Sequence, residues 1–140
     1  MVDSGPAARR GNWVLTPHPA EAARLLVEDT RTVQRDRFQA VEQLQARYGG
    51  VVVLKGNGTL VCDGQFIGLS DYGNPGMASG GMGDVLSGVI GALLGQNLSA
   101  MEAAALGVCL HGAAADTAAE QGQRGLLASD LMAPMRALLG

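Results

Sequence analysis

Val51-Val52-Val53-Leu54 runs directly into Lys55-Gly56-Asn57-Gly58-Thr59. Four consecutive apolar residues, three of them β-branched, are typical of a β-strand that is buried on both faces. Lys55 and the two glycines predict a tight turn, and Thr59–Cys62 predicts a second strand. Because open α/β sheets bind ligands where their strands end, an ammonium and backbone amides in this turn could meet a nucleotide phosphate. The alternative is a solvated lysine on a surface turn.

Further helices and strands are predicted on both sides of this strand. Before it we expect a short strand at 12–15, a helix beginning at Pro19, and a helix at 36–48 whose apolar face includes Phe38. After it we expect a hairpin strand at 65–69, a helix at 85–94, a helix from the capping box of Ser99 and Glu102 to near Gly122, and a short last helix after 129–130. This order predicts an α/β layer protein. Only one or two crossovers are visible, so the pattern also predicts an incomplete sheet.

Composition excludes several classes of protein. We expect the 140 residues to form a single domain, 1–140. Hydrophobic residues make up 47% of the chain and charged residues 16%, which excludes intrinsic disorder. The net charge of −3 and the lack of a basic stripe argue against nucleic-acid binding, and no apolar stretch is long enough to span a membrane. Cys62 and Cys109 lie in apolar contexts, so we expect reduced core residues of a cytoplasmic protein, without a disulfide or zinc site.

Gly80-Gly81-Met82-Gly83-Asp84 carries the strongest local signal for chemistry, because it lies where a helix begins. Glycines let backbone N–H groups turn toward a ligand, and a helix N-terminus adds about half a positive charge. These groups predict an anion site for a phosphate or a developing oxyanion, with Asp84 beside it as a base for a hydroxyl proton. A Gly-rich turn with Asp84 as a simple helix cap would explain the same residues. The segment is neither a Walker A loop nor a dinucleotide-binding fingerprint.

Three further polar residues have less specific patterns around them. His18 stands between two prolines after a strand, where it could contact a ligand or simply be solvated. His111 lies among Ala and Leu in a predicted helix, where we expect packing or a hydrogen bond between helices. Asp116 follows on the same helix and is expected to face solvent or to pair with a helix cap.

Three segments, in order along the chain, resemble those of one family. Residues 13–21 resemble its TPHPGE segment, with Ala20 in place of the usual glycine. Residues 54–59 resemble its LKGxGT segment, and residues 73–88 resemble its GNPGMATGGTGDVLTG segment. Leu110-His111-Gly112 and residues 128–131 match its later helices. The family is the ADP/ATP-dependent NAD(P)H-hydrate dehydratases, which have a three-layer, ribokinase-like fold. The resemblance runs from about Trp13 to the C-terminus.

The resemblance implies a reaction and a site. In the family, ADP (or ATP), with Mg²⁺, phosphorylates a hydroxyl on the damaged nicotinamide ring, and phosphate then leaves to regenerate NADH or NADPH. The positions that match the hydrate site are His18 and Asp84, with Asp84 as the catalytic base. The backbone N–H groups of Gly81, Met82 and Gly83 match the anion hole, and no metal-ligand cluster is visible. The positions that match the nucleotide site are Lys55, Gly56, Asn57, Gly58, Thr59 and Gly83.

Two departures from the family pattern affect these expectations. Met82 replaces the threonine of GTGD, which removes a hydroxyl near the phosphate but keeps the backbone N–H. The family's domain is longer, so we expect the chain to be the C-terminal portion of a ribokinase-like domain, with Val2-Asp3 as a remnant of the missing N-terminal half. We therefore expect either a homo-oligomer or an apolar cleft where the missing half docks. We also expect the 140 residues by themselves to be catalytically weak or inactive, because part of the hydrate pocket is absent.

Two other functions stay open beside NAD(P)H-hydrate dehydration. The chain could be another ribokinase-like kinase of small hydroxylated compounds, although its TPHPAE segment argues against this. It could also be a non-catalytic nucleotide-binding fragment.

Overall fold

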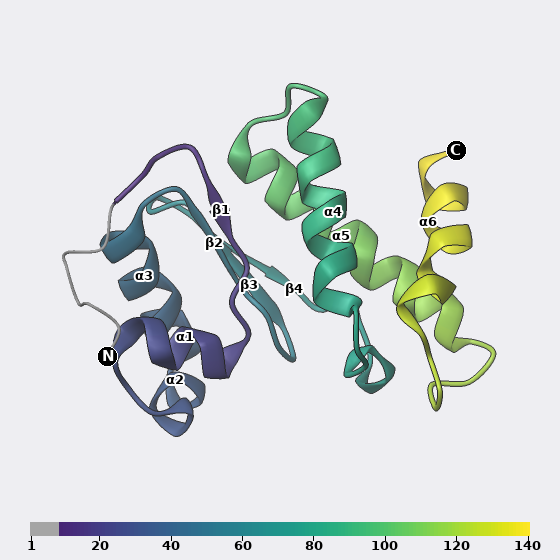
Figure 1. Cartoon of the computed structure of the whole chain (residues 1–140), viewed down its shortest axis with the longest axis horizontal. Helices are drawn as coiled ribbons and strands as arrows, with labels where there is room; N and C mark the ends of the chain where they lie inside the picture. Colours follow the sequence, from purple (N-terminus) through teal and green to yellow (C-terminus); the bar gives the residue numbers. More distant parts are fainter. Residues whose placement is uncertain (1–8) are drawn as a thin grey trace. The chain divides into compact units, whose positions relative to one another are not determined.

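The computed structural model describes residues 9–140, which form two compact units (Figure 1). The first unit comprises residues 9–56 and 60–68, and the second comprises residues 57–59 and 69–140. Val2-Asp3, the expected family remnant, lies outside the described residues. Within the described range, every helix is too short or too polar to cross a membrane.

Four strands form one mixed sheet in the order β1-β2-β3-β4. The strands are β1 (Val14–Leu15), β2 (Val51–Leu54), β3 (Thr59–Cys62) and β4 (Ile67–Ser70). β1 runs parallel to β2, and β2 runs antiparallel to β3. The strands predicted at 51–54 and 59–62 are therefore confirmed. β1 is shorter than the predicted strand, and β4 begins and ends later than predicted.

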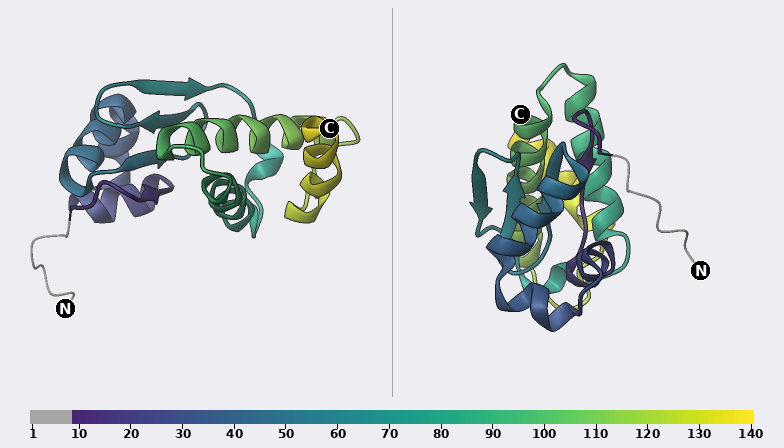
Figure 2. Two further views of the ribbon diagram at one scale, coloured as in Figure 1. Left: turned by 90° about the horizontal axis from the view of Figure 1, so that it is seen from above. Right: turned by 90° about the vertical axis from the view of Figure 1, so that its left-hand side faces the viewer.

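The core of the first unit lies between one face of β2 and β3 and three helices, α1 (Pro19–Leu26), α2 (Thr30–Arg35) and α3 (Arg37–Tyr48). Side chains alternate along a strand, so Val52 and Leu54 share a face with their ladder partners Cys62 and Leu60. All four side chains are buried in one cluster with residues of the helices. Figures 1 and 2 show these helices grouped beside the strands.

Two features of these helices differ from the prediction. α2 has a single buried residue, Val33, and so lacks the apolar periodicity that would have revealed it. Phe38, predicted on the apolar face of α3, is 52% exposed. Arg37, rather than Phe38, lies in line with the buried Val41 and Leu44, because residues four and seven positions apart share a helix face. The side chain at the start of the core-facing stripe is therefore a cation.

The second unit is built on α4 (Met82–Gly95), α5 (Ala100–Ala119) and α6 (Met132–Leu139). α5 packs against both α4 and α6. Gly107 allows the approach to α4, because a Cβ at this position would lie 2.7 Å from Cγ1 of Ile90. The predicted capping box of α5 is confirmed, since the Glu102 N–H donates to Ser99 Oγ at 3.2 Å and the Ser99 N–H donates to Glu102 Oε2 at 2.9 Å.

Two predictions about the second unit are corrected. α4 begins at Met82 rather than at Val85, because Gly81 adopts a left-handed conformation (φ 85°) and its carbonyl accepts a 3.0 Å hydrogen bond from the Val85 N–H. Cys109 was predicted to lie in the core, but it is exposed, whereas Cys62 is buried as predicted. Cys109 shares the outer stripe of α5 with the exposed Leu106, three residues earlier.

Candidate functional site

The carboxyl ends of β1 and β2 bring two of the predicted motifs side by side. The strands are parallel, and beyond their paired residues the Lys55 N–H donates to the carbonyl of Pro17 at 3.0 Å. His18 and the turn that begins at Lys55 therefore leave the sheet at the same edge. This is the edge at which open α/β sheets bind ligands. The structure agrees with the predicted position of Lys55 at the end of a buried strand.

His18 is the N-cap of α1, a role that the sequence analysis missed. Its Nδ1 accepts the Glu21 N–H at 3.2 Å, and its own backbone N–H donates to Glu21 Oε1 at 3.1 Å. Because Nδ1 is an acceptor, the proton of the neutral imidazole is on Nε2, which lies 3.1 Å from Glu21 Oε1. The imidazole is 49% exposed and is held in one orientation by these contacts. The signal for the cap was Glu21, three residues after His18.

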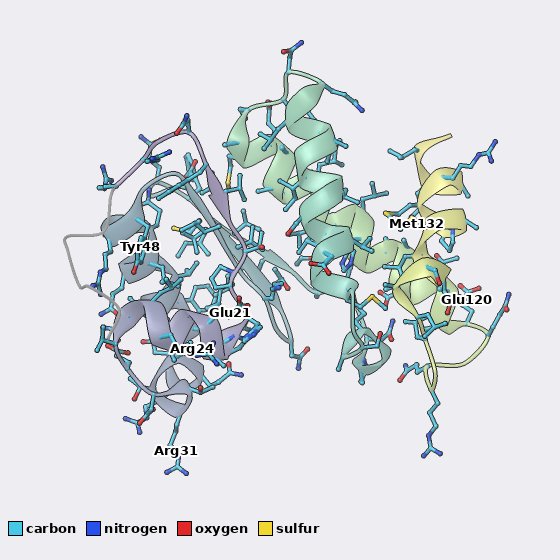
Figure 3. All side chains as sticks on the ribbon, in the orientation of Figure 1. Glu21, Arg24, Arg31, Tyr48, Glu120 and Met132 are labelled. Atoms are coloured by element: carbon cyan, nitrogen blue, oxygen red, sulfur yellow. The ribbon has the colours of Figure 1, made fainter. Side chains whose placement is uncertain are left out.

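A shallow cavity of about 340 Å³, largely open to solvent, lies beside this cap in the first unit. Glu21 and Arg24, both on α1 (Figure 3), contribute its charged side chains. Its other lining residues are Leu15, Thr16, Pro17 and Leu25. The cavity thus combines apolar walls with a carboxylate and a guanidinium, next to the histidine that the sequence analysis singled out.

Arg37 binds the backbone at the turn after β2. Its Nη2 donates to the carbonyls of Leu54 at 3.2 Å and of Lys55 at 3.3 Å. The guanidinium is half-buried, and this burial lowers the pKa of Arg37. Gly56 has a positive φ of 148°, and a Cβ there would lie 2.8 Å from Arg37 Nη2. Arg37 was not among the predicted site residues, because its partners are distant in the sequence.

The N-terminus of α4 carries the predicted anion hole and the predicted base. Met82, Gly83 and Asp84 form the first helical turn, whose N–H groups have no acceptor within the helix. The N-cap is Gly81, without a side-chain cap, and so Asp84 is an exposed first-turn residue rather than the cap itself. The Met82 side chain is buried in the core of the second unit.

Asp116 anchors the Gly-rich loop that precedes α4. Its Oδ1 accepts from Asn74 Nδ2 at 2.9 Å, and its Oδ2 accepts from the Gly73 N–H at 3.0 Å. Asn74 in turn caps a short 3₁₀ turn, η1 (Pro75–Met77), by accepting the Gly76 N–H at 3.0 Å. Of the two expectations for Asp116, pairing with a helix cap is therefore confirmed, because its partner Asn74 is the N-cap of η1.

The predicted site residues are divided between the two units. His18, Lys55 and Gly56 belong to the first unit. The remaining candidates, Asn57, Gly58, Thr59, Gly81, Met82, Gly83 and Asp84, belong to the second. Within the first unit the structure brings His18 and Lys55 to one sheet edge, and within the second it gathers residues 81–84 on one helical turn.

Metal ligands are not gathered in the described part of the chain. Among residues 9–140, no three His, Cys, Asp or Glu side chains come close enough together to hold a metal ion. Mg²⁺ in nucleotide-dependent enzymes is commonly held by one or two carboxylates and the phosphates of the substrate.

Comparison with known proteins finds one matching family and several relatives. The family model for NAD(P)H-hydrate dehydratase matches residues 2–136. A bifunctional NAD(P)H-hydrate repair enzyme from Vibrio cholerae is 61% identical over 127 residues, which are 90% of this chain and 26% of the relative. An ADP-dependent (S)-NAD(P)H-hydrate dehydratase from Neisseria meningitidis is 50% identical over 123 residues, which are 86% of this chain and 42% of the relative. The chain thus spans less than half the length of these relatives.

A solved structure extends the likeness to the fold. The ADP/ATP-dependent NAD(P)H-hydrate dehydratase from Bacillus subtilis, co-crystallised with ATP and Mg²⁺, superposes with a TM-score of 0.85 at 30% sequence identity. The alignment covers 94% of this chain and 50% of that one. The predicted fold class, α/β with a ribokinase-like arrangement, is confirmed by this likeness.

Proposed function

The chain belongs to the NAD(P)H-hydrate dehydratase family, and we propose that it takes part in the ADP-dependent dehydration of NAD(P)H hydrate, a lyase reaction that repairs the damaged cofactor. The observation that carries this proposal is the hydrogen bond from the Lys55 N–H to the Pro17 carbonyl. It sets the histidine of one family motif and the lysine of another at one sheet edge. ATP is the alternative phosphoryl donor.

The proposed first step is phosphoryl transfer to the hydroxyl of the hydrate. Asp84 takes the hydroxyl proton while the hydroxyl oxygen bonds to the terminal phosphorus of ADP, and AMP departs with the electron pair of the broken P–O bond. The N–H groups of Gly81, Met82 and Gly83 hold the charge that develops on the phosphoryl oxygens. The exposed carboxylate of Asp84 and the first turn of α4 support these roles.

The proposed second step is loss of phosphate from the ring. The C–O bond breaks and phosphate leaves with its electron pair, while the electron pair of a C–H bond on the neighbouring ring carbon forms the double bond and the proton passes to the departing phosphate. We assign His18 and Asp84 to the hydrate. Lys55, Gly56, Asn57, Gly58, Thr59 and Gly83 are assigned to the nucleotide. Mg²⁺ bound with the nucleotide would neutralise phosphate charge, and we assign no step to it.

The proposal also covers the oligomeric state of the chain and its location in the cell. The chain forms a single functional domain, either as a homo-oligomer or with further residues of a longer chain, in the cytoplasm. Light scattering on the 140-residue chain tests the first of these assemblies. A monomer with full turnover would contradict both.

A turnover assay with NADPH hydrate and ADP tests the activity, with recovered NADPH absorbance as the signal. Asp84→Asn is expected to lower turnover by about 10²–10⁴-fold, the usual worth of a positioned base, while ADP affinity changes little. Asp71→Asn is the matched control, because Asp71 is an exposed acid of the same unit. A near-normal rate for Asp84→Asn would remove Asp84 from the mechanism.

The same preparation separates the other two functions. Phosphorylation of a small alcohol without dehydration of the hydrate would indicate a kinase. ADP binding without either reaction would indicate a non-catalytic nucleotide-binding module. Equal ADP affinity of the wild-type chain and Lys55→Ala would remove Lys55 from the nucleotide site.

A further inference from the structure

Arg37 connects the start of α3 to the end of β2. It is the first residue of α3, and its Nη2 donates to two successive carbonyls, those of Leu54 and Lys55, at 3.2 and 3.3 Å. Leu54 is the last residue of the fully buried β2, and Lys55 opens the turn. One half-buried cation therefore binds the two peptide groups at which the strand becomes the turn.

These contacts determine the direction of the peptide groups. In a trans peptide the C=O and N–H bonds point in opposite directions. The peptide between Leu54 and Lys55 is held on both sides, because its carbonyl accepts from Arg37 and its N–H donates to the Pro17 carbonyl at 3.0 Å. The next peptide has its carbonyl on Arg37 as well, so the N–H of Gly56 is directed away from the guanidinium.

Gly56 leaves room for the guanidinium because it has no side chain. Its φ of 148° lies in a region that residues with a side chain rarely adopt. A Cβ at this position would also lie 2.8 Å from Arg37 Nη2 and 3.2 Å from Cζ. The glycine and the arginine therefore fit as a pair, and the pair sets the path of the backbone from Lys55 into Asn57.

We propose that Arg37 is a positioning residue for the nucleotide, which acts by fixing the Lys55 and Gly56 peptides so that the turn presents the Lys55 ammonium to the phosphates. The proposal rests on the nucleotide site proposed above. Arg37 acts through the backbone, since its guanidinium binds the carbonyl groups of Leu54 and Lys55. Its positive charge behind the turn adds to the attraction for an anion.

The test compares three variants of the 140-residue chain. Arg37→Gln removes the charge and the paired donors, Arg37→Lys keeps the charge but not the planar group, and Arg35→Gln is the control, because Arg35 is an exposed arginine two residues earlier. Two quantities are measured for each chain. They are the hydrogen-exchange rates of the Lys55 and Gly56 amides without ligand, and the dissociation constant of ADP by calorimetry.

Arg37→Gln is expected to speed exchange at these two amides and to weaken ADP binding about tenfold, the worth of one charge-assisted hydrogen bond. Arg37→Lys should recover part of both effects, and Arg35→Gln should change neither. Unchanged exchange in Arg37→Gln would overturn the proposal whatever the function of the chain. Faster exchange with unchanged ADP affinity would overturn it too.

Failure of the proposed function gives a different result. If the wild-type chain binds no ADP, the nucleotide site itself is overturned and the positioning role with it, even where exchange at Lys55 and Gly56 responds to Arg37. If Arg37→Gln does not fold, Arg37→Lys decides the question, because equal exchange rates and equal ADP affinity to the wild-type chain would show that the guanidinium is not needed.

Discussion

The side-chain amide of Asn74 donates a 2.9 Å hydrogen bond to the carboxylate of Asp116, 42 residues later in the chain. The second carboxylate oxygen accepts the Gly73 N–H at 3.0 Å. α5 thereby holds the start of the Gly-rich loop whose far end becomes the first turn of α4. This loop leads into the proposed anion hole, and Asp116, which binds the start of the loop, belongs to none of the predicted motifs.

Asp116→Ala is expected to lower the free energy of unfolding by about 1–2 kcal/mol, because two loop donors lose a charged acceptor. Asp71→Ala is the control, since Asp71 is an exposed acid just before the loop. Urea denaturation of both variants measures the effect. Equal unfolding free energies for the two variants would show that the loop does not need this carboxylate.

Gly107→Ala and Gly91→Ala are expected to change stability in opposite directions. A Cβ at Gly107 meets Ile90 Cγ1 at 2.7 Å in the interface of α4 and α5, and overpacking of this kind costs about 1–3 kcal/mol. Gly91 lies within α4 with nothing within 4 Å of its Cβ position, so alanine should stabilise the helix by up to about 1 kcal/mol. Thermal unfolding of the pair is the measurement, and shifts of the same sign would contradict the packing described for these helices.

Val27→Gly is expected to stabilise the first unit by about 1 kcal/mol, because the left-handed conformation strains residues with a Cβ. Val27 ends α1 with φ 58° and ψ 46°, and its side chain is 80% exposed, so little burial is lost. Val27→Ala keeps the Cβ and should gain less. The measurement is the melting temperature of the wild-type chain and of the two variants. A lower melting temperature for Val27→Gly than for the wild-type chain would mean that the valine side chain stabilises the fold by more than the backbone strain destabilises it.

The stability of the chain is expected to fall when the pH is lowered from about 5 to about 3, partly through Asp63. Its Oδ1 accepts the N–H groups of Phe66 at 2.8 Å and Gln65 at 2.9 Å, and these bonds lower the pKa of Asp63 below its ordinary value. A lowered pKa in the folded state means that the contribution is present above the unfolded pKa. It is lost as the pH falls through the folded pKa.

Asp63→Asn keeps the acceptor oxygen but removes the charge, so its unfolding free energy should depend less steeply on pH in this range. Some dependence should remain, since hydrogen bonds from Thr32 lower the pKa of Asp29 in the same direction. Urea titrations at a series of pH values measure both slopes. Identical slopes for the wild-type chain and Asp63→Asn would exclude Asp63 as a contributor.

Local patterns predicted most of the elements that position the site. The apolar run of Val51–Leu54 and the glycines after it predicted a buried strand and its turn, because burial on both faces and positive φ each demand particular residue types. α2 was missed because its one buried residue, Val33, leaves no periodic signal. The cap at His18 was missed because histidine is an unusual cap, although Glu21 stood at the capping-box position.

The sequence by itself determined where the buried strand β2 and its turn lie and which residue types could bind phosphate, since these depend on neighbours within a few positions. The tertiary structure alone decided which distant groups complete the site. Arg37 meets the carbonyls of Leu54 and Lys55 across 17 and 18 residues, and Asp116 meets Asn74 across 42. A guanidinium or a carboxylate can bind any suitable group within reach, so its partner follows only from the segments that packing brings beside it.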